Sequence, residues 1–65
     1  MENEGLVREL AKIRIEAKLV FDSMELDFKW AEMNINYNDI EGAKKWLERS
    51  AMGYKGLAME IEKLI

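Results

Sequence analysis

The residues that favour turns are concentrated in one short segment, NINYND, at positions 34–39, which holds three of the four asparagines of the chain. The chain has no proline, and neither glycine nor proline occurs between Leu6 and Ile40. Glycine and proline are the residues that most often interrupt regular structure. A single break in the chain is therefore expected, at residues 35–39.

The same segment combines the signals that end one helix and begin another. Asparagine tolerates the left-handed backbone conformation that follows many helices, so Asn36 or a neighbour is expected to end the first helix. Asn38 or Asp39 can then cap the next helix with a side-chain oxygen. Asn38 and Glu41 also have the spacing of a capping box. These signals predict one all-α domain, residues 1–65, built of two long helices and a tight turn.

Both predicted helices carry an apolar stripe with helical periodicity. In the second helix it repeats every seventh residue, as in a coiled coil, through Ile40, Leu47, Tyr54 and Ile61 and through Ala43, Ser50, Leu57 and Leu64. In the first helix it runs through Leu6, Leu10, Ile13, Ala17, Val20, Met24, Phe28, Ala31 and Ile35. This choice includes a four-residue step from Met24 to Phe28 and leaves Asp27 on a charged edge. A fold at Tyr37–Asn38 then pairs Ala31 with Ala43 and Phe28 with Leu47.

The pairing predicts an antiparallel hairpin whose arms have similar lengths, about 40–45 Å at 1.5 Å per residue. Two other folds fit parts of the pattern. Asp22 and Glu25 have capping-box spacing, which would break the first helix near Asp22 and give a three-helix bundle. The alternation of apolar and polar residues from Ile13 to Trp30 has strand periodicity, which would give a β-hairpin turning at Asp22–Ser23. The absence of threonine and the many helix-forming residues favour helices.

The first helix has a second apolar stripe, roughly 160° around from the first at ~100° per residue. We call it the second stripe; its members are Ile15, Leu19, Leu26, Trp30, Met33 and Tyr37. One neighbouring helix cannot cover two opposite faces, and a contiguous apolar patch of this kind marks an interface. The second stripe is therefore the predicted interface, and two hairpins related by two-fold symmetry would form a four-helix bundle dimer. Trp30, Tyr37 and Trp46 are also expected to form an aromatic cluster near the turn.

Composition excludes several classes of function. The 65 residues form a domain too short to bury a large core, and the chain has no cysteine that could add a disulfide. It has no histidine, and its two serines have no base beside them in the pattern, so we predict no enzyme, no metal site and no cofactor. A net charge of −3 with interleaved acids and bases disfavours nucleic acid. No apolar run is long enough for a signal peptide or membrane span, so a cytoplasmic protein is expected.

Two short segments resemble known families. Residues 38–51, NDIEGAKKWLERSA, resemble the second helix of a tetratricopeptide repeat or of a microtubule-interacting and trafficking domain, although the preceding helix lacks the matching Trp, Gly and Tyr positions. That resemblance implies a module that binds helices. SMELD, residues 23–27, is similar to the SQELD signature of small helical-hairpin aspartyl-phosphate phosphatases that regulate sporulation. It implies that Ser23, Glu25, Leu26 and Asp27 would meet a response regulator.

The sequence thus predicts a non-enzymatic helical interaction or structural protein that self-associates through the second stripe. The alternative is a small regulatory module, an adaptor or an inhibitor, that docks a helix into a larger protein partner. The expected partner is a second copy of the chain or another helical protein, with neither nucleic acid nor a membrane involved.

Overall fold

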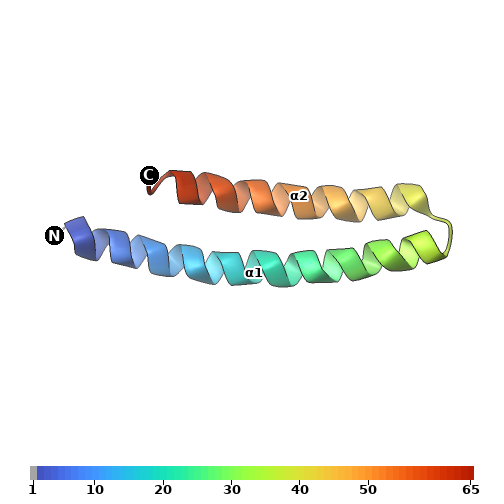
Figure 1. The fold of residues 1–65 in the computed structure, drawn as a ribbon, viewed down its shortest axis with the longest axis horizontal. Coiled ribbons are helices and arrows are strands. Elements are labelled where there is room, and N and C mark those ends of the chain that lie inside the picture. Colours follow the sequence, from blue (N-terminus) through green and yellow to red (C-terminus); the bar gives the residue numbers. More distant parts are fainter. Residues whose placement is uncertain (1) are drawn as a thin grey trace.

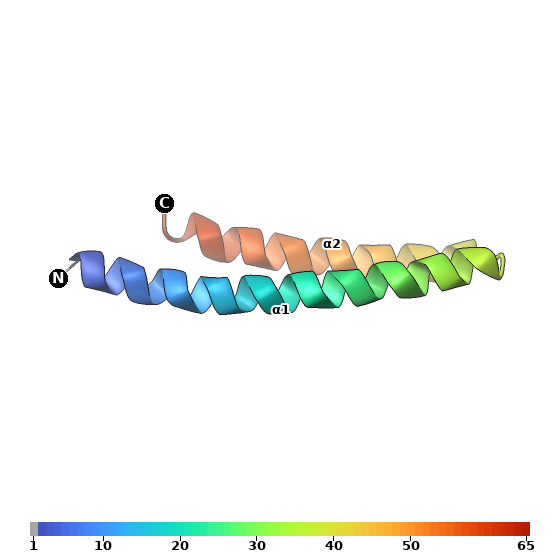
Figure 2. The same cartoon turned by 60° about the horizontal axis from the view of Figure 1, so that its bottom comes forward.

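The protein is a hairpin of two antiparallel helices that lie side by side along their length (Figures 1 and 2). The computed structural model describes residues 2–65, with side chains from residue 3 onward. Helix α1 spans Glu2–Asn36 and helix α2 spans Ile40–Glu62. The predicted all-α hairpin is confirmed. The two alternatives are wrong, because α1 is continuous through Asp22 and no strand occurs within residues 2–65.

Helix α1 continues through Asp22 because this residue pairs with a side chain of the same helix and does not cap a new one. Its carboxylate lies 3.5 Å from the Lys18 ammonium one turn earlier. A second pair of the same spacing, Lys29 and Glu25 at 3.8 Å, follows directly. Exposed pairs four residues apart stabilise a helix by about 0.2–0.5 kcal/mol each. With no glycine or proline in this region, nothing offsets that preference.

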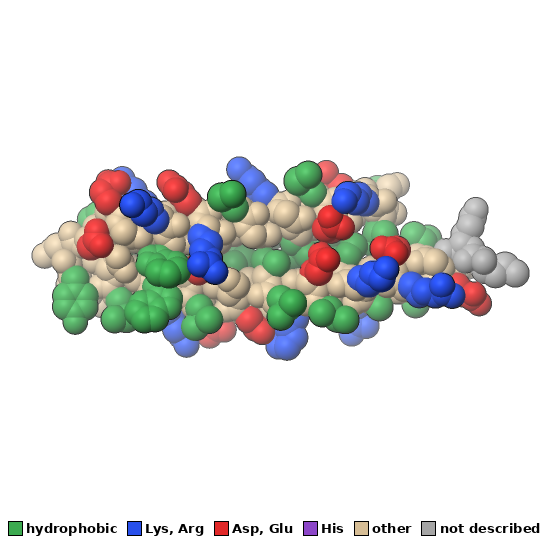
Figure 3. Space-filling model, turned by 180° about the vertical axis from the view of Figure 1, so that it is seen from behind, with side chains coloured by type: hydrophobic (Ala, Val, Ile, Leu, Met, Phe, Trp, Pro, Cys, Tyr) green, Lys and Arg blue, Asp and Glu red, His purple; other side chains and the backbone are tan. Residues whose placement is uncertain are grey.

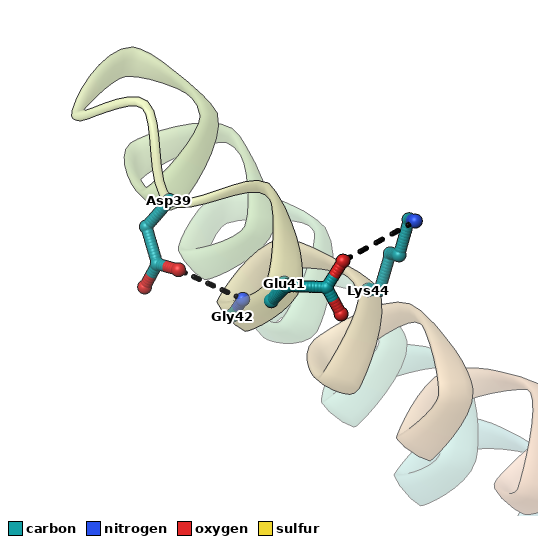
Figure 4. A network of polar contacts seen from close by, with 4 residues as sticks. All are labelled: Asp39, Glu41, Gly42 and Lys44. Atoms are coloured by element: carbon teal, nitrogen blue, oxygen red, sulfur yellow. Dashed lines mark hydrogen bonds and ion pairs between the residues drawn. The ribbon is translucent and has the colours of Figure 1, made fainter.

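The asparagine cluster forms the turn, and the structure shows which residue is left-handed and which one caps α2. Asn38 adopts the left-handed conformation, with φ of 61°. Asp39 is the N-cap of α2, and its side chain accepts a hydrogen bond from the Gly42 N–H at 3.0 Å (Figure 4). The other carboxylate oxygen of Asp39 accepts from the Asn34 side-chain amide at 2.9 Å. Asp39 is the N-cap and the Asn38 N–H donates to the Ile35 carbonyl at 2.9 Å, so Asn38 and Glu41 do not form a capping box. Glu41 instead pairs with Lys44 at 3.5 Å.

Gly42 leaves room for the side chains that cap α2. A Cβ at position 42 would collide with the Asn34 amide and the Asp39 carboxylate, the two groups that hold the cap together. Gly56 differs, since a Cβ there would have no neighbour within 4 Å. We expect Gly42→Ala to lower the free energy of unfolding by about 1–2 kcal/mol through loss of the cap. The matched control, Gly56→Ala, should raise it by about 1 kcal/mol, as alanine does in a helix interior. Urea unfolding followed by circular dichroism measures both, and equal effects of the two changes would contradict this role for Gly42.

The two arms differ in length, contrary to the prediction. Helix α1 has 35 residues and α2 has 23 residues, which correspond to about 52 Å and about 35 Å at 1.5 Å per residue. The amino-terminal turns of α1 therefore project past the end of α2 (Figure 1). The apolar side chains on this projection, Leu6, Val7 and Leu10, are 49–65% exposed.

Candidate interaction surfaces

The seam between the helices is narrow and partly polar. Its buried apolar residues are Ile13, Ala31, Ala43 and Leu57. Both members of the predicted Ala31–Ala43 pair are thus buried. Asp27 and Ser50 are also buried, at 3% and 4% exposure. The prediction that Asp27 lies on a charged edge was wrong.

The heptad explains the position of Asp27. Buried or half-buried residues of α1 recur every seventh position at Ile13, Val20, Asp27 and Asn34. The seam therefore keeps a regular coiled-coil period through Asp27. The four-residue step from Met24 to Phe28 does not occur in the packing, and Phe28 remains 50% exposed.

The Asp27 carboxylate is satisfied within the seam. One oxygen accepts a hydrogen bond from the Ser50 hydroxyl at 3.0 Å. The other lies 3.8 Å from Arg49 Nε, whose side chain is 67% exposed. No buried side-chain nitrogen or oxygen in the described part of the chain lacks a partner. Because Asp27 and Ser50 come from different helices, their bond fixes the register of α1 against α2. The SMELD resemblance would require Asp27 at the surface, whereas the structure buries this residue in the seam.

A broad apolar face lies beside the seam and is built by both helices. We call it the two-helix face; its members are Phe21, Phe28, Ile35, Ile40, Leu47, Tyr54 and Ile61. Six of the seven members directly follow a buried or half-buried position, as Phe28 follows Asp27 and Leu47 follows Trp46, while Ile40 precedes Leu47 by one heptad. In antiparallel helices such positions point to the same side of the pair. All seven side chains are 43–54% exposed, so the hairpin covers only about half of each.

The second stripe lies on the opposite side of α1, where Figure 3 shows apolar side chains following this helix between acidic and basic ones. Its six members are 46–79% exposed. Near the turn the stripe is partly covered by α2, because Trp30 stacks on Trp46 with ring centroids 6.2 Å apart. Arg49 lies over the Trp46 ring, 5.9 Å from its centroid. Two members of the predicted aromatic cluster therefore meet, while Tyr37 is 79% exposed.

Three further features of the structure bear on what the hairpin can bind. A shallow hollow opens between the helices beside Asp27 and Ser50, where Ser23 and Gly53 are small. Within the described residues no three His, Cys, Asp or Glu side chains are grouped to hold a metal ion. Neither described helix has a stretch apolar and long enough to cross a membrane. What the structure presents is extended apolar surface, which binds other apolar surfaces.

The second stripe is predicted from the sequence, whereas the two-helix face is not. The apolar periodicity places most members of the two-helix face in the intrachain seam, where they would be buried. The sequence does contain a signal that distinguishes the two-helix face from the seam. Helix α2 has apolar residues at both 46 and 47, and again at 57 and 58, which is more than a two-helix seam can enclose.

Comparison of the chain with protein-family models, with curated proteins and with solved structures finds no match. Neither resemblance noted in the sequence therefore gains support, and the function has to be inferred from the surfaces of the hairpin.

Proposed function

We propose that this protein is a non-enzymatic helical interaction protein whose hairpin self-associates to complete a helical bundle. The observation that carries this proposal is the imbalance between core and surface. Four apolar residues are buried among residues 3–65, whereas nineteen large apolar side chains are exposed. A chain of this size without a disulfide needs additional apolar burial to be stable, and a second copy is the simplest source.

Symmetry favours a second copy of the hairpin over a different protein as the partner. A two-fold axis lets one surface serve both members of a dimer, and such dimers are the commonest soluble oligomers. Two helical hairpins packed face to face make a four-helix bundle, in which each helix has two neighbours. Each helix then buries more of its surface than the single partner in the hairpin allows.

A second candidate function follows from the second stripe. It is one helix wide, and the stacked pair Trp30 and Trp46 lies at one end of it. An amphipathic helix of a partner protein fits a surface of this shape, and tryptophan is enriched at the centres of protein interfaces. On this basis the hairpin would act as an adaptor or inhibitor, with or without self-association.

Concentration-dependent melting tests the proposal. A self-associating protein gains stability by mass action, so its melting temperature rises with protein concentration without any added partner. For a cooperative dimer of this size, a tenfold increase should raise the melting temperature by about 5 °C. Circular dichroism at 222 nm over a hundredfold concentration range measures the effect. A melting temperature that stays constant over that range would contradict self-association.

A further inference from the structure

We propose that the two-helix face is the self-association surface, and that its occupant is a second copy of the hairpin with its turn at the opposite end. This inference rests on the proposed function and specifies the face and the arrangement. The two-fold axis would lie in the plane of the face and cross the helices at right angles. Helix α1 then packs against the α1 of the other copy, and α2 against α2, each pair antiparallel.

The exposed area matches what such a dimer needs. The accessible surface of the hairpin is 5625 Å², whereas a compact monomer of its 7.6 kDa mass would expose about 4,300 Å². The excess, about 1,300 Å², is larger than the ~800 Å² that each partner buries in a standard protein–protein interface. A face contributed by both helices can bury this amount, whereas the second stripe belongs to α1 and is one helix wide.

The pattern of apolar positions also fits a bundle. A two-stranded coiled coil needs two apolar positions per heptad, whereas a helix with two neighbours needs a third. In this hairpin the third position is filled by members of the two-helix face on both helices. Their half-exposed side chains, at 43–54%, already contact the seam and have their outer halves free.

Charged residues on the α1 side of the two-helix face change sign along that helix. Arg14 lies toward the amino-terminal end and directly follows the buried Ile13, and Glu32 lies toward the turn and directly follows the buried Ala31. Among the ion pairs found in residues 3–65, none involves Arg14 or Glu32.

The positions of these two charges set the level of the axis. Arg14 and Glu32 are centred on residue 23. The bond between Asp27 and Ser50 sets the hairpin register, and it places residue 23 level with residue 53 of α2 within about one residue. A two-fold axis at this level brings Arg14 to the other copy's Glu32. Opposite charges at the rim of an interface favour that orientation.

Charge reversal tests this arrangement. Arg14→Glu replaces two attractive contacts per dimer by repulsive ones, and at low salt it should raise the dissociation constant roughly tenfold. Adding Glu32→Arg to the same chain restores opposite charges and should return the constant to within roughly threefold of the parent. Sedimentation equilibrium measures all three proteins. If the turns lay at the same end, Arg14 and Glu32 would not meet across the dimer, so the double reversal would not restore the constant, which would overturn the proposal.

A second measurement tests the face independently of the charges. The chain has no cysteine, so Leu47→Cys and Leu26→Cys each create a single thiol, the first on the two-helix face and the second on the second stripe. Dimerisation should slow the reaction of the thiol at 47 with a maleimide and leave the thiol at 26 unaffected. Protection at 26 alone in a dimeric protein overturns this inference and leaves the proposed function standing. A protein that stays monomeric overturns the proposed function itself.

Discussion

Phe28→Glu combined with Leu47→Glu should convert the protein to a monomer throughout the micromolar range. The two residues are 50% and 44% exposed in the hairpin, so each can accept a charge there at moderate cost. In the dimer their outer halves are buried, and burial of four such half-exposed side chains contributes about 3–6 kcal/mol. Loss of that energy raises the dissociation constant at least about a hundredfold. Helical content should fall as well, because a short hairpin alone buries little apolar surface.

The control for this experiment places the same charges on the second stripe. Leu19→Glu with Leu26→Glu changes side chains that are 64% and 56% exposed and leaves the seam and the two-helix face intact. Analytical ultracentrifugation and circular dichroism at equal concentrations compare the two double variants. We expect the control to keep the molar mass and melting temperature of the parent. If the control dissociates and the first variant does not, the second stripe is the dimer interface.

Ser50→Ala should lower the free energy of unfolding by about 1–3 kcal/mol per chain, although it removes a single oxygen. The substitution takes away the hydroxyl that donates to Asp27 at 3.0 Å, and Asp27 is 3% exposed. Arg49, 3.8 Å away and largely exposed, is the remaining ionic partner. A buried carboxylate that loses a hydrogen bond bears the cost of its own desolvation.

A companion variant separates the hydrogen bond from the packing. Asp27→Leu with Ser50→Ala removes the carboxylate as well, and an apolar pair of similar volume is often neutral or stabilising at such a site. We expect the double variant to recover most of the stability that Ser50→Ala loses, as measured by urea unfolding. A single variant as stable as the parent, within about 0.5 kcal/mol, would show that the Ser50 hydroxyl does not stabilise the seam.

The local signals in the sequence were sufficient for the fold. The chain has no proline, one cluster of asparagines and an apolar stripe on each predicted helix. Few folds can form its backbone hydrogen bonds and also bury both stripes, and the antiparallel hairpin is one of them. The side chain of Asp39 caps α2 as one of the two predicted candidates. Asn36 is the last residue of α1, and the left-handed conformation that follows the helix is taken by its neighbour Asn38.

The details of the seam are harder to predict because an apolar pattern does not include a buried charge. Asp27 breaks that pattern, yet Ser50 on the facing helix provides a hydrogen-bond donor that makes its burial tolerable. That partnership depends on the register between helices, which no local pattern reports. Once Asp27 is placed in the seam, Phe28 and its equivalents move outward, and the two-helix face follows from the heptad.

The molar mass of the unmodified protein in solution tests most directly the claim that one hairpin is half of an assembled bundle. Sedimentation equilibrium at micromolar concentration should give twice the 7.6 kDa mass of the chain, with dissociation on dilution. A protein that remains well folded and cooperative at the mass of one chain would show that the narrow seam is sufficient by itself. That result would contradict self-association.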